Sequence, residues 1–225
     1  MKQKIVVQDL GLLSYDEAYQ QQIRLQQKLL SWQENPKNFQ HHFLIFCEHF
    51  PIVTLGKSGK KENLLLPEDQ LKEKNIDFHW TNRGGDITYH AQGQLVVYPI
   101  LDLHYLKKDL HWYLRCLEEI CIQTLTNFGI SAFRFEGKTG VWVGDKNQEK
   151  KMVAIGIHCK KWITLHGLAF NIDINLTPFN FIVPCNITDK AVTRLIDFNP
   201  EITMTQVKIK ILEHFLTIFD LDLKG

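Results

Sequence analysis

The segment MVAIGIHCKKWITLHGLAFNI, residues 152–172, contains two apolar runs that are joined at Lys160 and Lys161. Each run has the length and composition of a strand, and so short a connection predicts an antiparallel β-hairpin. Because such a hairpin breaks strict alternation of strands and helices, the segment favours an α+β sandwich of sheet and helices over a doubly wound parallel sheet.

Helices and strands are mixed along the rest of the chain. A capping-box pattern at Ser14 to Glu17 predicts a helix that ends near Trp32. Apolar spacing predicts a second helix from about Asp109 to Phe128, stopped by Gly129, and a third from Thr205 to Phe219. Further strand-like segments cover residues 43–47, 52–55, 76–80, 94–100 and 141–143.

Length and composition are those of an ordinary globular chain. The 225 residues, 44% hydrophobic and 23% charged, contain no repeat and no linker-like stretch, so we expect one domain spanning residues 1–225. A net charge of +1 provides no basic excess for nucleic-acid binding, and no apolar run approaches the ~20 residues of a membrane helix. We therefore expect a protein that binds neither nucleic acid nor membranes.

The N-terminus and the cysteines indicate the compartment. The first residues lack the long apolar core of a secretion signal, and the five cysteines include no CxxC pair. Free thiols are typical of a reducing environment, so we expect a cytoplasmic protein.

Neither a metal site nor a nucleotide-binding loop is expected. Gly137 to Thr139 and Gly56 to Ser58 each resemble the end of a phosphate-binding loop, but Ala132 and Pro51 stand where its first glycine belongs. The histidines and the cysteine among residues 41–49 lack a second ligand pair at zinc-like spacing.

The most unusual stretch is RGGDITYHAQGQ, residues 83–94, which places a cation, paired glycines, a carboxylate and a histidine before an apolar strand. Gly84 and Gly85 can adopt backbone angles closed to other residues and let a ligand approach main-chain N–H groups. The alternative is a tight turn in which Arg83 and Asp86 satisfy each other, and composition does not decide between the two.

Cys185 is the cysteine with the most distinctive surroundings. Thr188 or Asp189 can cap a short helix that continues through Val192 and Leu195, which would place the thiol near a helix N-terminus. The helix dipole contributes only about 0.3–1 kcal/mol, less than one pKa unit. A lysine ammonium at ~4 Å would be enough to bring the thiol pKa below about 7. The other four cysteines are expected to be buried and inert.

Lys151 begins the first strand of the hairpin, so its side chain has a fixed direction. An exposed lysine is the ordinary outcome at such a position. However, Ala154 and Gly156 alternate along one side of that strand and would leave room for a ligand beside main-chain groups. Gly167 to Ala169 on the partner strand could complete the wall of this slot.

Several segments together resemble the lipoyl(octanoyl) transferases of lipoate biosynthesis. The similarity covers most of the chain, in six blocks that keep the family's order. These blocks are Glu48 to Gly56 with Glu62 to Leu64, Arg83 to Pro99, Gly140 to Val143, Lys151 to Gly156, His166 to Asn171, and Pro184 with Cys185. The Arg-Gly-Gly block and the Pro-Cys block are specific, whereas the Gly-Val-Trp-Val block would be weak alone.

The resemblance implies the fold of the biotin/lipoate protein ligase catalytic domain, with mixed, largely antiparallel sheets and flanking helices. It implies transfer of an octanoyl group from octanoyl-acyl carrier protein to a specific lysine of lipoyl domains. The implied acceptors are those of 2-oxoacid dehydrogenase complexes and the glycine cleavage H protein. Because a carrier thioester is already an activated acyl group, neither ATP nor a cofactor is expected.

The resemblance also implies roles for individual residues. The family's nucleophile falls on Cys185, which would take the octanoyl group as a thioester, and the lysine that lowers its pKa falls on Lys151. Either His90 or His166 could instead relay the proton, and the sequence does not choose. The implied acyl-substrate site consists of Arg83, Gly84, Gly85, Asp86, Ile87, Thr88, Tyr89, His90, Ala154, Ile155, Gly156, Gly167, Leu168 and Ala169.

The sequence departs from the family pattern in two places. Ala91 and Gln92 replace the usual Gly-Pro, and Asn186 replaces a glycine that commonly follows the cysteine. Loss of the proline relaxes the loop after His90, which bears on substrate placement rather than on the type of reaction.

Three other functions are compatible with these residues. The chain could be an amidotransferase that moves octanoyl or lipoyl groups between protein lysines. It could be an ATP-dependent lipoate ligase, or a non-catalytic module that holds acyl chains or lipoyl domains.

Overall fold

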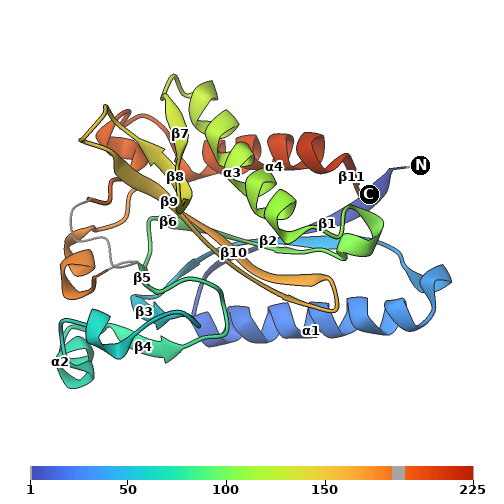
Figure 1. The fold of residues 1–225 in the computed structure, drawn as a ribbon, viewed down its shortest axis with the longest axis horizontal. Helices are drawn as coiled ribbons and strands as arrows, with labels where there is room; N and C mark the ends of the chain where they lie inside the picture. The colour runs from blue at the N-terminus through green and yellow to red at the C-terminus, as the bar shows by residue number, and fades with distance from the viewer. Residues whose placement is uncertain (1, 184–190, 225) are drawn as a thin grey trace.

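The computed structural model describes residues 2–183 and 191–224. Its main feature is an eight-stranded sheet in the order β11-β1-β2-β6-β10-β9-β8-β7 (Figure 1). The strands are β1 (Gln3–Leu13), β2 (His42–His49), β6 (Gln94–Ile100), β7 (Ala132–Phe135), β8 (Lys138–Val143), β9 (Lys150–Lys160), β10 (Ile163–Asn171) and β11 (Leu221–Leu223). β1 pairs in parallel with β2 and with β11, and the other neighbours are antiparallel.

A three-stranded sheet lies beside the large one. β3 (Ile52–Leu55) is its central strand, parallel to β4 (Asp77–Trp80) and antiparallel to β5 (Ile87–His90). The short helix α2 (Glu68–Glu73) lies next to β4 (Figure 1). This second sheet brings residues 83–90 over the β9–β10 hairpin.

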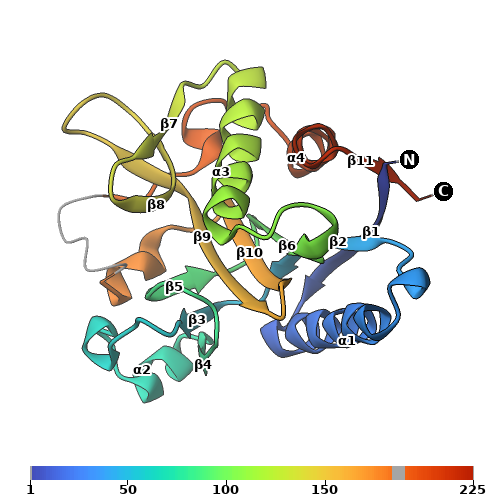
Figure 2. The same ribbon diagram turned by 45° about the vertical axis from the view of Figure 1, so that its right-hand side comes forward.

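Three long helices cover the two faces of the large sheet. α1 (Tyr15–Glu34) lies on one face, and α3 (Leu110–Asn127) and α4 (Met204–Phe219) lie on the other (Figures 1 and 2). Ala18, Leu25 and Leu29 of α1 are buried against sheet residues, which contributes about 1.5–3 kcal/mol for each leucine. Short 3-10 helices cover Pro36–Asn38, Lys61–Asn63, Leu103–Tyr105, Thr177–Phe181 and Leu195–Asp197.

The hairpin predicted from residues 152–172 is confirmed. Lys160 pairs with Ile163, and Lys161 and Trp162 form the two-residue turn between them. Both turn residues have positive φ, 50° and 64°, as a type I′ turn requires. The expected α+β fold with mixed, largely antiparallel sheets is confirmed as well.

The predicted helix ends also agree with the structure. Ser14 caps α1 through the expected capping box with Glu17. Asp109 caps α3, and Gly129 follows its end with φ +74°. α4 begins at Met204 behind the Thr203 cap.

β1, β5, β7 and β11 are strands that the sequence patterns do not mark. β1 has a mixed burial pattern, and its partners β2 and β11 lie far along the chain. β5 occupies residues that look like a loop because glycines and charges precede it. Among the described residues, no helix has the length and apolar character required to span a membrane.

Candidate functional site

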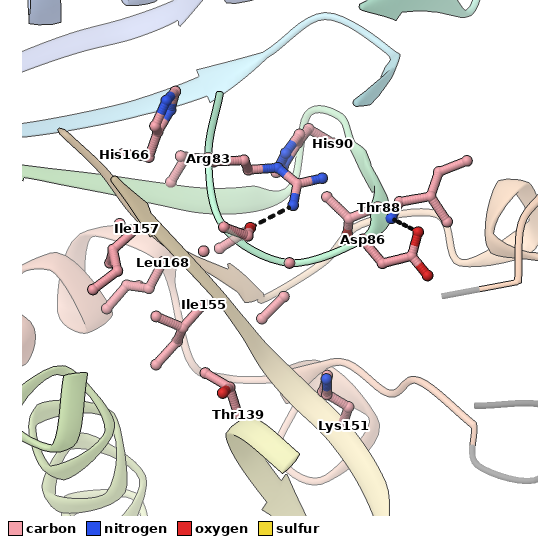
Figure 3. Close-up of a pocket in the computed structure, with 18 of the residues that line it drawn as sticks. Arg83, Asp86, Thr88, His90, Thr139, Lys151, Ile155, Ile157, His166 and Leu168 are labelled. Atoms are coloured by element: carbon pink, nitrogen blue, oxygen red, sulfur yellow. Dashed lines mark hydrogen bonds between the residues drawn. The ribbon is translucent and has the colours of Figure 1, made fainter. Parts of the chain in front are cut away.

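A cavity of about 440 Å³ lies where residues 83–90 pass over β9 and β10 (Figure 3). Every described residue of the predicted site lines it, apart from Tyr89. Tyr89 instead packs edge-on against Phe179, with 5.6 Å between ring centroids. Contact of the lining residues with substrate stays a prediction.

Buried polar contacts hold the loop at residues 83–86. Arg83 donates from Nη2 to the carbonyl oxygen of Thr54 at 2.7 Å and to its Oγ1 at 2.9 Å. Asp86 accepts from Asn63 Nδ2 at 2.6 Å and from the Ile87 N–H at 2.7 Å. The two charged side chains therefore tie the loop to β3 and to the segment at Asn63, which differs from the simple Arg83–Asp86 turn considered above.

Glycines bring this loop into backbone contact with β9. The Gly84 N–H donates to the Ile157 carbonyl at 2.8 Å, and Gly85 has φ +84°. A Cβ on Gly156 would lie 2.6 Å from the Gly84 carbonyl oxygen and 3.3 Å from Arg83 Cδ. The space beside Gly156, expected to be open for a ligand, is therefore occupied by the loop itself.

The turn after His90 carries the departure from the family's Gly-Pro. The Gln94 N–H donates to the Ala91 carbonyl at 3.2 Å, and the Gly93 N–H donates to the Glu48 carboxylate at 2.7 Å. Ala91 itself is buried. These contacts restrain the turn without a proline.

Lys151 lies at one end of the cavity-lining part of β9. The lining residues of this strand run from Lys151 to Ile157, about 20 Å of extended chain, and Figure 3 shows Lys151 and Thr139 well apart from Ile157 and His166. The Lys151 side chain is half-buried, and its Nζ lies 4.9 Å from the centroid of the Trp142 ring. A cation above a tryptophan face is favourable.

The segment that follows the predicted nucleophile is anchored to Lys151. The Lys151 N–H donates to Ala191 O, and the Thr193 N–H donates to Lys151 O, both at 3.0 Å. On the other side, the Val183 N–H donates to the Asn63 carbonyl at 2.8 Å. Cys185 itself lies outside the described residues, together with Thr188, Asp189 and Asn186.

The described part of the helix predicted after Cys185 is not α-helical. Val192 forms a parallel bridge with Lys151, and Leu195 begins the 3-10 helix Leu195–Asp197. Extended backbone at residues 191–193 can hydrogen-bond to the start of β9, which a helix would prevent. The prediction of a helix through Val192 and Leu195 is therefore wrong.

The two histidines considered as proton relays are both buried and neutral. Burial lowers the pKa of His90 to about 3, and burial likewise lowers that of His166 to about 3. His90 Nδ1 lies 2.7 Å from Gln94 Oε1, and His166 Nε2 lies 2.6 Å from Asn82 Oδ1. His166 pairs with Ile157 and is thus about 20 Å from Lys151 along the strand.

The thiols of the cysteines that the structure describes are poor nucleophiles. Cys47, Cys116, Cys121 and Cys159 carry free thiols. Burial raises the pKa of all four, to about 11 for Cys116. Three are buried, as expected, whereas Cys159 is only half-buried, so the expectation of burial is wrong for it.

Several further cavity residues are not among those assigned to the site from the sequence. Tyr15, Gln94, Tyr98, Lys138, Thr139, Asn171 and Phe179 line the cavity in addition to the predicted set. They come from α1, β6, β8, β10 and the Thr177–Phe181 turn, and only the tertiary structure brings them together.

Within 2–183 and 191–224, no group of three or more His, Cys, Asp or Glu side chains could hold a metal ion. Gly137 to Thr139 belong to the β7–β8 hairpin, in which Phe135 pairs with Lys138, rather than to a strand-to-helix turn. A phosphate-binding loop needs that turn because the helix N-terminus supplies its N–H groups.

A family model for the lipoyl protein ligase A/B catalytic domain matches residues 18–216. The chain belongs to this family. Within the family it is 44% identical to an octanoyltransferase of Cytophaga hutchinsonii, over 98% of this chain and 95% of that protein. It is 41% identical to an octanoyltransferase of Christiangramia forsetii, over 100% and 99% of the two chains.

Solved structures show the same family fold. The bi-partite lipoate protein ligase of Thermoplasma acidophilum superimposes with a TM-score of 0.75 at 18% identity, covering 99% of this chain and 86% of that one. At this identity the comparison concerns the fold alone. The resemblance deduced from the six sequence blocks and the fold it implied are both confirmed.

Proposed function

We propose that this protein transfers an octanoyl group from octanoyl-acyl carrier protein to a specific lysine of a lipoyl domain, through a thioester at Cys185. It is an acyltransferase of protein lipoylation. The observation that carries the proposal is the long cavity with apolar walls at Ile155, Ile157 and Leu168 and with Lys151 at one end. Near-full-length similarity to octanoyltransferases supports the same activity.

The assignment of the nucleophile rests on two supports. The four described cysteines are disfavoured because burial raises their thiol pKa values. In addition, the described residues on both sides of Cys185 are hydrogen-bonded near the cavity. Ala191 accepts from the lining residue Lys151, and Val183 donates to Asn63, whose Nδ2 donates to the lining residue Asp86. The chain connection therefore starts and ends beside the proposed site.

Lys151 has two successive roles in this mechanism. While it is protonated, its charge favours the Cys185 thiolate, which attacks the octanoyl carbonyl. The C–S bond to the carrier breaks, and the departing carrier thiolate takes its proton from Lys151, which becomes neutral. The acylated sulfur carries no charge, so it no longer favours a protonated Lys151. Lys151 can then accept the proton of the incoming lysine amine, whose own pKa near 10.4 keeps it mostly unreactive at neutral pH.

The second half-reaction restores the enzyme. The acceptor amine attacks the Cys185 thioester, an amide forms, and the sulfur leaves as a thiolate beside the newly protonated Lys151. Because the donor is already a thioester, no nucleotide and no cofactor are required.

The apolar walls provide the basis for choosing the acyl chain. Burial of six methylenes contributes roughly 5 kcal/mol, at about 0.8 kcal/mol each. One methylene more or less in the acyl chain changes the free energy that discriminates between substrates by only about 1–3 kcal/mol. Neighbouring chain lengths should therefore react slowly rather than not at all.

The covalent intermediate is the first test. The protein is incubated with octanoyl-acyl carrier protein, and intact mass is expected to show an octanoyl adduct that hydroxylamine removes. Cys185→Ala should abolish the adduct, and Cys159→Ala, which removes a half-buried thiol elsewhere, should retain it. An adduct that persists in Cys185→Ala at another cysteine would overturn the assignment.

The electrostatic role of Lys151 has its own measurement. The alkylation rate of Cys185 against pH gives the thiol pKa, and Lys151→Ala is expected to raise it. An unchanged profile would mean that Lys151 does not activate the thiol, and it would not contradict the proposed acyltransferase activity.

The choice of donor separates this function from its alternatives. Activity with acyl carrier protein and without ATP supports the proposal, whereas a need for ATP and free acid would identify a ligase. Transfer only from an acylated lipoyl domain would identify an amidotransferase. Tight acyl binding without turnover would identify a binding module.

The acceptors, the compartment and the domain organisation follow from the same proposal. The acceptors are lipoyl domains of 2-oxoacid dehydrogenase complexes and the glycine cleavage H protein, and the reaction takes place in the cytoplasm. Residues 1–225 form one catalytic domain. In support of this, β1 pairs with β11, so strands from the two ends of the chain are neighbours in one sheet.

A further inference from the structure

A chain of buried hydrogen bonds links the cavity wall to the backbone of Lys151. His90 Nδ1 lies 2.7 Å from Gln94 Oε1, and Gln94 Nε2 donates to Asn171 Oδ1 at 2.8 Å. Asn171 Nδ2 donates to the Thr193 carbonyl at 3.0 Å, and the Thr193 N–H donates to the Lys151 carbonyl at 3.0 Å. The side chains of His90, Gln94 and Asn171 all line the cavity, and each is less than a tenth exposed.

The direction of every bond in this chain is determined by backbone carbonyls. A carbonyl oxygen can only accept, so the Thr193 carbonyl requires the NH₂ group of Asn171, whose oxygen then faces Gln94. Gln94 Nε2 also donates to the Tyr89 carbonyl, at 3.3 Å, which requires the same orientation. Gln94 therefore presents its oxygen to His90, and His90 Nδ1 must carry the proton.

The other ring nitrogen of His90 also has a partner. His90 Nε2 lies 3.4 Å from Thr54 Oγ1, and that oxygen already accepts hydrogen bonds from Arg83 Nη2 and Nε at 2.9 and 3.2 Å. The Thr54 hydroxyl proton is thus left to be donated to Nε2. Rings of Tyr15 and His49 pack against His90, at 6.3 and 5.9 Å between centroids.

We propose that His90 is a positioning residue, neutral with its proton on Nδ1, which together with Gln94 and Asn171 holds Lys151 and residues 191–193 against the cavity. It keeps this proton and does not relay one between the reacting groups during acyl transfer. This inference rests on the proposed function, in which Lys151 is the partner of the nucleophile. It removes one of the two histidines that the sequence left open as relays.

Two matched substitutions test the proposal. The amide nitrogen of His90→Asn can replace the Nδ1 donor, and the longer side chain of His90→Gln places its amide near the Nε2 position. We expect His90→Asn to retain at least about ten-fold more kcat than His90→Gln, because loss of the chain misplaces Lys151. KM for the carrier should change less than kcat, and the pH profile of His90→Asn should keep the wild-type shape.

Equal loss in both variants, or higher activity in His90→Gln, would overturn the proposal. A measurement on the wild type avoids dependence on how the variants fold. Nitrogen NMR of the histidine-labelled protein should show His90 as the neutral Nδ1–H tautomer throughout the pH range of activity. A neutral Nε2–H form, or a His90 titration that coincides with a limb of the activity profile, would refute it.

The same experiments separate failure of this inference from failure of the proposed function. A wild type that fails to transfer octanoyl groups in the presence of carrier and lipoyl domain contradicts the function, whatever the tautomer. A wild type that does transfer them, with a titrating His90, contradicts only the positioning role.

Discussion

Replacing Gly156 by alanine is the smallest change that should displace the loop at residues 83–86. The added Cβ would lie 2.6 Å from the Gly84 carbonyl oxygen, whereas ordinary contact begins at 3.4 Å. Relief requires a shift of about 0.8 Å in a loop that the Gly84 N–H pins to Ile157 O at 2.8 Å. Overpacking of this kind costs about 1–3 kcal/mol, or roughly 2–12 °C in Tm for a chain of this size.

The loss of activity should be larger than the loss of stability alone would cause. A misplacement near 1 Å in a substrate-positioning element reduces rates by about 100-fold. We therefore expect kcat/KM for octanoyl transfer to a lipoyl domain to fall by about 10- to 100-fold in Gly156→Ala, with the protein still folded at the assay temperature.

Gly129→Ala provides the matched control. Gly129 has φ +74° at the end of α3, with no atom within 4 Å of an added Cβ, so the substitution strains the backbone without displacing a neighbour. The left-handed conformation costs alanine about 1–2 kcal/mol, a similar loss of stability away from the cavity. We expect its activity to match the wild type.

The assay combines thermal unfolding with steady-state transfer from octanoyl-acyl carrier protein. If Gly156→Ala transfers octanoyl groups within two-fold of the wild type, the loop does not position the substrate as argued. If Gly129→Ala loses as much activity as Gly156→Ala, the loss reflects general destabilisation.

Three further predictions concern the surroundings of the cavity. Trp142→Leu removes the ring 4.9 Å from Lys151 Nζ and should raise the Cys185 thiol pKa by about 0.5–1 unit, measured from the alkylation rate against pH. Trp142→Phe should shift this pKa less, and no shift in either variant would contradict a role of the Lys151–Trp142 contact. Glu118→Ala removes a buried carboxylate that pairs with Arg115 at 2.6 Å and Arg134 at 3.1 Å and accepts from the Gly140 N–H. Because both arginine side chains are partly exposed, no buried charge is left unpaired, and chemical denaturation should show a loss of about 1.5–3 kcal/mol; a loss below about 1 kcal/mol would refute the pairing. Burial lowers the pKa of His42, His90 and His166 to about 3 and that of His49 to about 4, below the unfolded value near 6.5, so between these pH values the unfolded chain binds more protons than the folded chain. The stabilisation from these histidines should be fully present above about pH 6.5, and the free energy of unfolding should decrease as the pH falls toward 3. A free energy of unfolding that stays constant from pH 7 to 5 would contradict burial of neutral histidines.

Local patterns in the sequence were sufficient for the elements that depend on local physics. The β9–β10 hairpin follows from two apolar runs with a two-residue connection, and the ends of α1 and α3 follow from Ser14 and Gly129. These features require only contacts between residues close in the chain, so their signals lie within a few positions. The six family blocks extended this local information to the fold and to the expected chemistry.

Contacts between distant residues decided the rest. β5 looked like a loop because glycines and charges precede it, and its pairing with β3 makes it a strand. The helix expected through Val192 was replaced by a pairing with Lys151, forty-one positions away. The sequence alone determined which residue types the site contains. The tertiary structure decided that Gly84 fills the space beside Gly156 and that His90 connects through Gln94 and Asn171 to Lys151, because hydrogen-bond direction and close packing exist only once separate strands are side by side.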